Sequence, residues 1–186
     1  DSGWYGAPHE ADPYPNCGSE WARYVGDWQV NTTTHPTGDL LPIANAIHAA
    51  NKKFLLWFEP ERFYPDTPIA KEEPFSYSNG LVYYGDERSY NWIKSAVFGT
   101  IAKHHVDIYR QDFNMEPTGC WAVLEEREGA DRVGVAEMKH IEGVYRFLDE
   151  MRATFPWIAQ ENCASGGRRI DIDMGSRAHS YCRSDY

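Results

Sequence analysis

The chain has 186 residues, of which 42% are hydrophobic and 25% are charged, a composition typical of a folded globular protein. Its 18 lysines and arginines against 28 aspartates and glutamates give a formal net charge of −10, whereas nucleic-acid-binding proteins usually carry a basic surface. No stretch approaches the roughly 20 apolar residues of a membrane helix. We therefore expect neither nucleic acid nor a membrane as a partner.

Helices alternate with short strands after a long loop over residues 1–39. Apolar residues at helical spacing indicate the helices, and short apolar runs that end in polar residues indicate the strands. In chain order we expect a helix over 41–50 and a strand over 53–58, a helix from about 89 to 101 and a strand over 106–109, a helix over 135–155 and a strand over 157–160, then a short helix over 169–177 and a strand over 179–182. This alternation predicts a parallel α/β fold.

An open doubly wound sheet and a (β/α)8 barrel both fit this alternation. The residues that follow the strands favour the barrel, because every strand ends in a polar or acidic cluster and barrel enzymes gather their chemistry at these ends. The clusters are Glu59/Glu61, Asp112/Asn114, Glu161/Asn162 and Ser184/Asp185. A complete barrel takes roughly 250 residues. We therefore predict a partial (β/α)8 TIM barrel, a single catalytic-barrel segment over residues 1–186, with the remaining strands outside this chain.

Asp112 and Asp185 are the candidate catalytic residues. Each follows a predicted strand, so both side chains would point into the mouth of the barrel. Two carboxylates that face one site can hydrolyse a glycoside, one as the nucleophile and the other as the proton donor to the leaving oxygen. The alternative is that both are structural acids paired with Arg110 and Arg183, because structural ion pairs often resemble catalytic sites.

The acidic pair in Glu59-Pro60-Glu61 competes for the acid/base roles. The proline turns the chain at the end of the strand, so one glutamate could face the site while the other tethers a loop. Acids outside a catalytic pair are also commonly partners of structural ion pairs. Both interpretations remain open at this stage.

Small residues follow the strand that ends at Asn162, and such a turn lets backbone amides approach a ligand closely. A Cys163 nucleophile with His179 as its base is a further alternative, although a free cysteine is usually a small buried apolar residue. The four cysteines lie at wide spacings without a Cys-x-x-Cys, and the histidines at 104–105 lie where a helix ends. We predict no metal site and no cofactor.

The aromatic share of 15% exceeds what a core of this size needs. Trp4, Tyr5, Trp28 and Trp57 lie in loops or at strand ends. Sugar rings have apolar faces that stack on such side chains, while core packing is the ordinary fate of a single tryptophan. Some of these rings are expected to line a binding site.

Six motifs in series resemble those of one enzyme family. In chain order they are Asp1-Ser2-Gly3-Trp4-Tyr5, Gly26-Asp27-Trp28-Gln29-Val30-Asn31, Trp57-Phe58-Glu59-Pro60-Glu61, Arg110-Gln111-Asp112-Phe113-Asn114, Glu161-Asn162-Cys163-Ala164-Ser165-Gly166-Gly167 and Cys182-Arg183-Ser184-Asp185. Their order and spacing resemble glycoside hydrolase family 36, the alpha-galactosidase (melibiase) family, across almost the whole chain.

The resemblance implies a retaining enzyme that cleaves terminal α-linked galactose from oligosaccharides on a (β/α)8 barrel. The chain would run approximately from the end of barrel strand 2 to the end of strand 6, with accessory β domains elsewhere in the protein. By resemblance, Asp112 is the nucleophile and Asp185 the acid/base. The residues that would line the sugar pocket are Asp1, Trp57, Arg110, Asn114, Cys163 and Gly166.

Several positions depart from the family pattern: Ser2 replaces an acid, Arg110 a lysine, and Gln111 and Cys182 each a tryptophan. The arginine that the family has just before a Leu-Val strand is also missing, because Ser78-Asn79-Gly80-Leu81-Val82 stands there. Arginine and lysine differ in shape and donor geometry, so the sugar pocket is expected to be altered. Two alternatives follow: the same mechanism on α-N-acetylgalactosaminides or another α-glycoside, and a non-catalytic sugar-binding homologue. Whether the parent protein forms a homo-oligomer is an open question at this stage. The isolated chain is expected to be poorly stable and inactive, because a partial barrel leaves strand edges unpaired.

Overall fold

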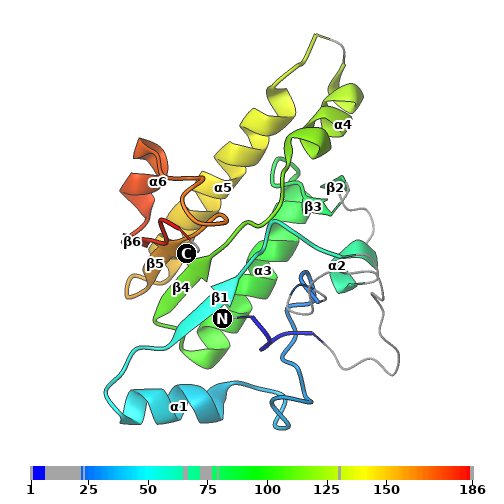
Figure 1. Ribbon diagram of the computed structural model, residues 1–186. Coiled ribbons are helices and arrows are strands. Elements are labelled where there is room, and N and C mark those ends of the chain that lie inside the picture. Colours follow the sequence, from blue (N-terminus) through cyan, green and yellow to red (C-terminus); the bar gives the residue numbers. More distant parts are fainter. Residues whose placement is uncertain are drawn as a thin grey trace.

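The computed structural model describes residues 2–6, 22, 24–64, 67–71, 77–78, 80–129 and 131–184. Four parallel strands form its central sheet in the order β1, β4, β5 and β6 (Figure 1). Their bounds are Leu55–Phe58 for β1, Ile108–Gln111 for β4, Ala159–Asn162 for β5 and Ser180–Tyr181 for β6. Trp57 lies beside Arg110, and Arg110 lies beside Glu161. A short antiparallel hairpin joins β2 (Tyr77–Ser78) to β3 (Leu81–Val82).

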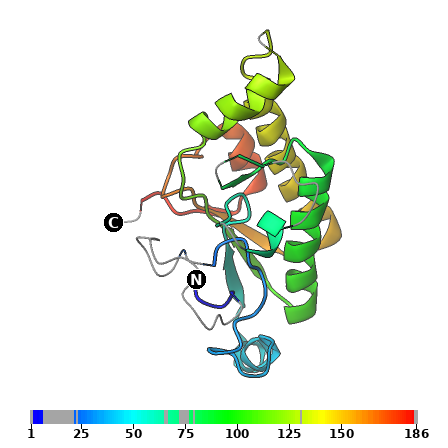
Figure 2. The ribbon, with the colours of Figure 1, turned by 90° about the vertical axis from the view of Figure 1, so that its right-hand side faces the viewer.

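Six helices are present in the part of the chain that the structure describes. They are α1 (Leu41–Ala49), α2 (Pro68–Lys71), α3 (Glu87–His104), α4 (Thr118–Glu128), α5 (Val135–Thr154) and α6 (Ile172–Arg177). Figure 2 shows α3 and α5 together on one side of the sheet. Strands that follow one another in this order, with the connecting helices on one face, form part of a (β/α)8 barrel, which confirms the predicted fold class. None of the helices in the described ranges is long and apolar enough to span a membrane.

Local signals explain where the helices begin and end. Asp86 caps α3, because its side chain accepts hydrogen bonds from the N–H groups of Arg88 and Ser89. The helix therefore begins two residues before the expected start near Ser89. Asp171 caps α6 in the same way, so this helix begins at Ile172 and not at the expected residue 169.

The buried face of α5 does not follow the apolar residues alone. Met138 is apolar but 53% exposed, whereas His140 and Gly143 are buried. A Cβ atom on Gly143 would lie only 2.6 Å from the backbone oxygen of Tyr84, so the missing side chain lets the helix approach the chain before α3. This close approach rotates the buried face away from the purely apolar stripe.

The strands are shorter than their apolar runs. Strand β5 begins at Ala159, while Trp157 lies in the preceding turn and is 60% exposed.

Helix α4 was not predicted. Its sequence has only a narrow apolar stripe, and the helix is stabilised by packing against α5 and the hairpin.

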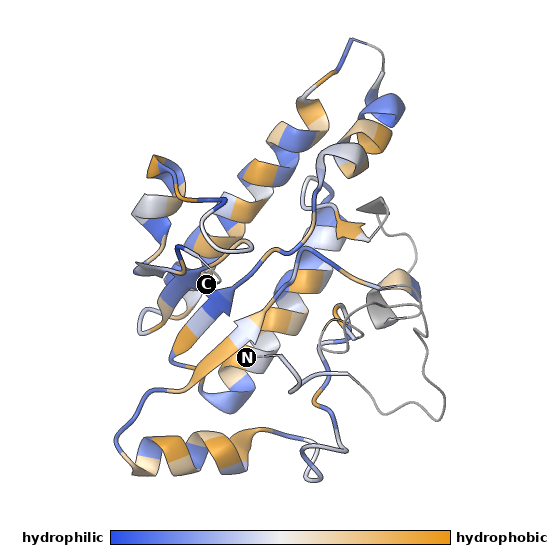
Figure 3. Ribbon diagram, viewed as in Figure 1, coloured by the Kyte–Doolittle hydropathy of each residue, from blue (hydrophilic) through white to orange (hydrophobic). Residues whose placement is uncertain are grey.

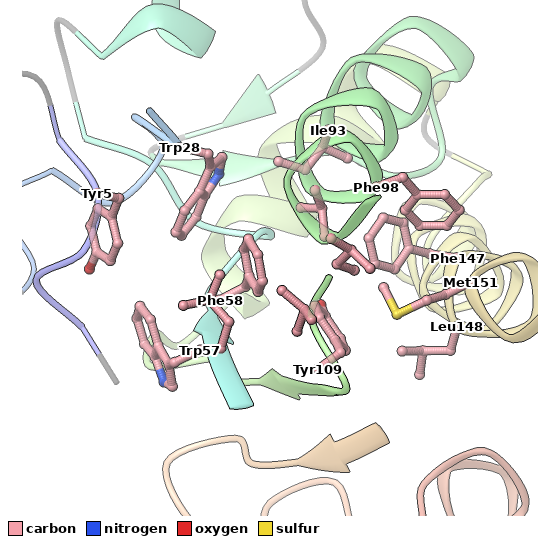
Figure 4. Packing of buried hydrophobic residues seen from close by; sticks show 14 of the residues in the cluster. Tyr5, Trp28, Trp57, Phe58, Ile93, Phe98, Tyr109, Phe147, Leu148 and Met151 are labelled. Carbon is pink, nitrogen blue, oxygen red and sulfur yellow. The ribbon is translucent and has the colours of Figure 1, made fainter. Parts of the chain in front are cut away.

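Side-chain alternation gives the sheet two distinct faces. Tyr109 and Gln111 of β4 are buried toward the helices, whereas Ile108 and Arg110 are half-buried on the opposite face. Figure 4 shows Phe58 and Tyr109 packed toward residues of α3 and α5 such as Ile93 and Phe147. Figure 3 shows hydrophobic residues along β1 and hydrophilic ones at the end of β4. The face opposite the helices, called here the inner face, therefore carries the polar chemistry.

Candidate active site

Asp112 directly follows β4, and its backbone N–H donates to the Phe58 carbonyl at 2.8 Å, which continues the parallel pairing with β1. Asp112 as a whole residue is 8% exposed. Oδ1 accepts the backbone N–H of Phe113 at 2.8 Å and of Ser165 at 3.2 Å, and Oδ2 accepts Nε1–H of Trp57 at 3.1 Å. Three N–H donors from three parts of the chain thus fix the orientation of this carboxylate.

Arg110, two residues earlier on the inner face, forms a short ion pair with Glu161 of β5. Glu161 is thus the ion-pair partner of Arg110 in the described structure, which opposes the alternative in which Arg110 pairs with Asp112. Burial alone would lower the pKa of the Arg110 guanidinium, but Glu161 and the nearby thiols of Cys163 and Cys182 raise it. Arg110 is thus a fixed cation beside both cysteines.

The turn after β5 brings Cys163 and Gly166 to Asp112. Ser165 and Gly166 have φ values of 48° and 79°, and the Gly166 N–H donates to Cys163 Sγ at 3.4 Å. Ser165 Oγ donates to Asn114 Oδ1 at 2.9 Å, which ties the turn to the loop after β4. A left-handed backbone at Gly166 costs little because glycine has no Cβ atom.

Burial raises the pKa of the Cys163 thiol to about 12, and the nearby Asp112 carboxylate adds to the rise. A thiol with such a pKa stays protonated at neutral pH and is a poor nucleophile. The ring of His179, its expected base, accepts the backbone N–H of Gln160 at 3.0 Å through Nδ1. These observations oppose the Cys163 nucleophile.

The tryptophans and tyrosine expected near a sugar lie inside the molecule. Trp4, Tyr5, Trp28 and Trp57 are only 2–6% exposed and belong to the main core cluster. Tyr5 stacks on Trp57 with ring centroids 5.9 Å apart, and Trp4 Nε1 donates to the Trp57 carbonyl at 2.9 Å. Figure 4 shows Tyr5, Trp28 and Trp57 on the β1 side of the cluster. Their burial favours core packing for Trp4, Tyr5 and Trp28, whereas Trp57 also donates a hydrogen bond to Asp112.

Glu59 and Glu61 are both fully buried and held by protein partners. Glu59 accepts Arg62 Nη2 at 2.6 Å, and Glu61 pairs with Arg169 at 2.6 and 2.8 Å. Burial raises the pKa of Glu59, although Arg62 partly opposes the rise. The structural interpretation of this acidic pair therefore holds. The sequence did not indicate that Arg169 belongs to this site, because its partner Glu61 lies 108 residues away in the chain.

The structure gathers most of the expected site residues around Asp112. Trp57, Arg110, Asn114, Cys163 and Gly166 come from the ends of β1, β4 and β5, as described above. The Cys182 N–H donates to the Asn162 carbonyl at 3.0 Å, so Cys182 lies beside Cys163. Asp1 and Asp185 lie outside the described residues. Within those residues, no group of three or more histidines, cysteines or acids could hold a metal ion.

Comparisons with known proteins identify close architectural relatives. The family model described as Melibiase matches residues 1–186. Alpha-galactosidase from Escherichia coli is 30% identical over 173 residues, which cover 87% of this chain and 23% of that protein. The crystal structure of the alpha-galactosidase AgaA from Geobacillus stearothermophilus matches with a TM-score of 0.78 at 25% identity, over 98% of this chain and 25% of that one.

A variant of AgaA, solved in complex with stachyose, also matches with a TM-score of 0.78, at 24% identity over 88% of this chain and 24% of its own. The present chain thus spans about a quarter of the length of the relatives it matches.

Proposed function

Because this chain belongs to the melibiase family, we propose that the complete protein is a glycoside hydrolase that releases terminal α-linked galactose from oligosaccharides. The observation that carries the proposal is the Asp112 carboxylate, oriented by three N–H donors at the end of β4. The relatives named above are alpha-galactosidases, and one of them was solved with stachyose bound. An α-galactoside oligosaccharide is accordingly the proposed substrate.

The proposed mechanism is a double displacement. A carboxylate oxygen of Asp112 forms a bond to the anomeric carbon while the bond from this carbon to the leaving oxygen breaks, and Asp185 donates its proton to that oxygen. Asp185 then takes a proton from water, whose oxygen attacks the anomeric carbon and displaces Asp112. Two inversions give net retention, and both acids return to their starting protonation states.

Other residues of the site are proposed to bind the sugar. Arg110 presents a cation on the inner face, and Asn114 and Cys163 adjoin the Asp112 carboxylate. Gly166 carries no side chain, which leaves room for a sugar hydroxyl group near the thiol of Cys163. Asp1 and Trp57 complete the proposed sugar pocket.

Hydrolysis of 4-nitrophenyl α-galactoside by the complete protein tests this function, with the first anomer released followed by NMR. Asp112→Asn keeps the size of the side chain but removes the nucleophile, so kcat should fall at least about 1,000-fold. The wild-type protein should release the α anomer first. A β anomer, or an Asp112→Asn variant with kcat near the wild-type value, would contradict the mechanism.

A second candidate keeps the mechanism and changes the sugar. It is favoured by Cys182, which lies beside Cys163 and Arg110 at a position where the family pattern has the much larger tryptophan. A smaller side chain leaves room for a bulkier substituent, such as the acetamido group of N-acetylgalactosamine. Ranking kcat/KM over a panel of aryl α-glycosides separates the two, since a preference for the galactoside would eliminate this candidate.

A further inference from the structure

The segment Glu59-Pro60-Glu61 holds the chain on both sides of Asp112. Gln111, the residue before Asp112, donates from Nε2 to Glu61 Oε1 at 2.9 Å. Asn114, two residues after Asp112, donates from its backbone N–H to Glu59 Oε1 at 2.6 Å. Both carboxylates are fully buried, so water does not compete for these hydrogen bonds.

Arg169 extends the contact of Glu61 to the residue that follows Asp112. Its Nη1 and Nη2 atoms donate to the two oxygens of Glu61 at 2.6 and 2.8 Å, and such a bidentate pair fixes the plane of the guanidinium. This plane lies over the Phe113 ring, with Cζ 4.3 Å from the ring centroid. Glu61 therefore holds one neighbour of Asp112 directly and the other through Arg169.

His140 is a further partner of Glu61, and Tyr109 is a further partner of Gln111. His140 Nδ1 accepts the Tyr84 backbone N–H at 3.2 Å, so the ring proton lies on Nε2, which donates to Glu61 Oε2 at 2.8 Å. Gln111 Oε1 in turn accepts the Tyr109 hydroxyl at 3.0 Å. Burial alone would raise the pKa of Glu61, but Arg169 and His140 lower it to about 2. Glu61 thus stays ionised and exchanges no proton during a reaction near neutral pH.

We infer that Glu61 is a positioning residue that acts through Gln111 and Arg169 to fix the direction in which Asp112 presents its carboxylate. The inference rests on the proposed function, because it takes Asp112 as the nucleophile. Attack at carbon needs close alignment, and a misplacement of about 1 Å can cost on the order of 100-fold in rate. Gln111 stands where the family pattern has tryptophan, so its link to Glu61 distinguishes this chain from that pattern.

Gln111→Met in the complete protein tests the link, because methionine has a similar volume and removes only the hydrogen bonds of the amide. Gln160→Met is the matched control. Gln160 is equally buried at 2% exposed, lies on the same face of the neighbouring strand, and donates to the Leu148 carbonyl at 2.8 Å. The substrate is 2,4-dinitrophenyl α-galactoside, whose leaving group departs without a proton, so the first step reports attack by Asp112 and not proton donation by Asp185.

Gln111→Met should lower the rate of the first step at least about 10-fold with KM changed less than about two-fold, which indicates a loss confined to the transition state. Gln160→Met should keep this rate within about two-fold, with a similar fall in Tm. Equal rates in the two variants, or a change in KM alone, would overturn the positioning role.

Phe113→Leu decides the question if Gln111→Met does not fold. Leucine removes the ring beneath Arg169 but keeps the backbone N–H that binds Asp112. The same loss of rate is expected, and an unchanged rate overturns the inference. A well-folded wild-type protein that hydrolyses no α-galactoside would overturn the proposed function and the inference together, whereas an active wild type with an unaffected variant overturns the inference alone.

Discussion

Trp57 contributes both an N–H group and a flat ring to the candidate site. Trp57→Phe would keep the stacking on Tyr5 and remove the hydrogen bond to Asp112 Oδ2. A hydrogen bond to a charged group contributes about 1.5–3 kcal/mol, so kcat/KM should fall about 10- to 100-fold. Steady-state kinetics with 4-nitrophenyl α-galactoside measures the loss.

Trp28→Phe is the control for this prediction. Trp28 is 6% exposed, and its Nε1 atom makes no hydrogen bond within the described structure. The same substitution there removes an N–H group without breaking a contact to Asp112, so kcat/KM should stay within about two-fold. An equal loss in both variants would mean that aromatic packing, and not the N–H donor, accounts for the effect of Trp57.

The contacts around Asp112 show which parts of the site the sequence could predict. The motif order placed Asp112, Trp57 and Cys163 at the ends of successive strands, and parallel strands bring such ends together. The sequence could not predict that Glu61 binds Arg169, because a partner 108 residues away depends on how the loop after β5 folds back. A buried carboxylate needs such a partner, but its identity comes only from the tertiary structure.

At the scale of the elements, Asp107 joins α1 to the beginnings of β1 and β4. Its carboxylate accepts hydrogen bonds from Lys53 Nζ at 2.8 Å and the Phe54 backbone N–H at 2.9 Å, and it lies 2.7 Å from His48 Nε2. Burial alone would raise the pKa of Asp107, but these partners lower it from 3.8 to about 2. The ionised form therefore stabilises the folded state.

Because the folded pKa is lower than the unfolded one, this stabilisation is present above about pH 4 and is lost as the pH falls toward 2. Asp107→Asn should lower the free energy of unfolding by about 1–2 kcal/mol at pH 7, allowing for screening by solvent. Thermal unfolding from pH 7 to pH 2 should show the Tm difference from wild type shrinking over pH 4 to 2.

Asp149→Asn is the matched control, since Asp149 pairs with Arg177 at 3.0 Å but is 53% exposed. Exposed pairs contribute about 0–1 kcal/mol, so its Tm should change little. A Tm difference for Asp107→Asn that stays constant down to pH 2 would show that lost packing, and not the charge, is responsible.

The helices show which structural features the spacing of apolar residues predicts and which it does not. The extent of α5 follows from its apolar residues, but its buried face includes His140 and Gly143, which no apolar stripe would select. His140 is buried because it binds Glu61, and Gly143 because Tyr84 packs directly against it. Helix α4 has weak periodicity and owes its stability to neighbouring elements. Sequence patterns therefore predicted elements better than the faces they bury.

At the scale of the whole molecule, the site lies on the inner face of a sheet whose other face is covered by helices. Phe58 and Tyr109 pack toward the helices, while Arg110 and Glu161 are half-buried on the inner face, where Trp57 lies beside Arg110. Because loops after several parallel strands converge on Asp112, any change that separates β1 from β4 or β4 from β5 would pull donors away from its carboxylate. Activity should therefore depend on the pairing of these strands as much as on the individual side chains.

The 186-residue chain produced alone should behave as an incomplete fold. Within the described residues, β1 pairs only with β4 and β6 only with β5, so each leaves one edge of the sheet open. Open parallel edges and a half-buried inner face favour association between chains. Size-exclusion chromatography should show oligomers or aggregates, circular dichroism should show a broad thermal transition, and 4-nitrophenyl α-galactoside should not be hydrolysed. A monomer with a sharp, cooperative transition would show instead that these four strands and their helices form a self-sufficient unit.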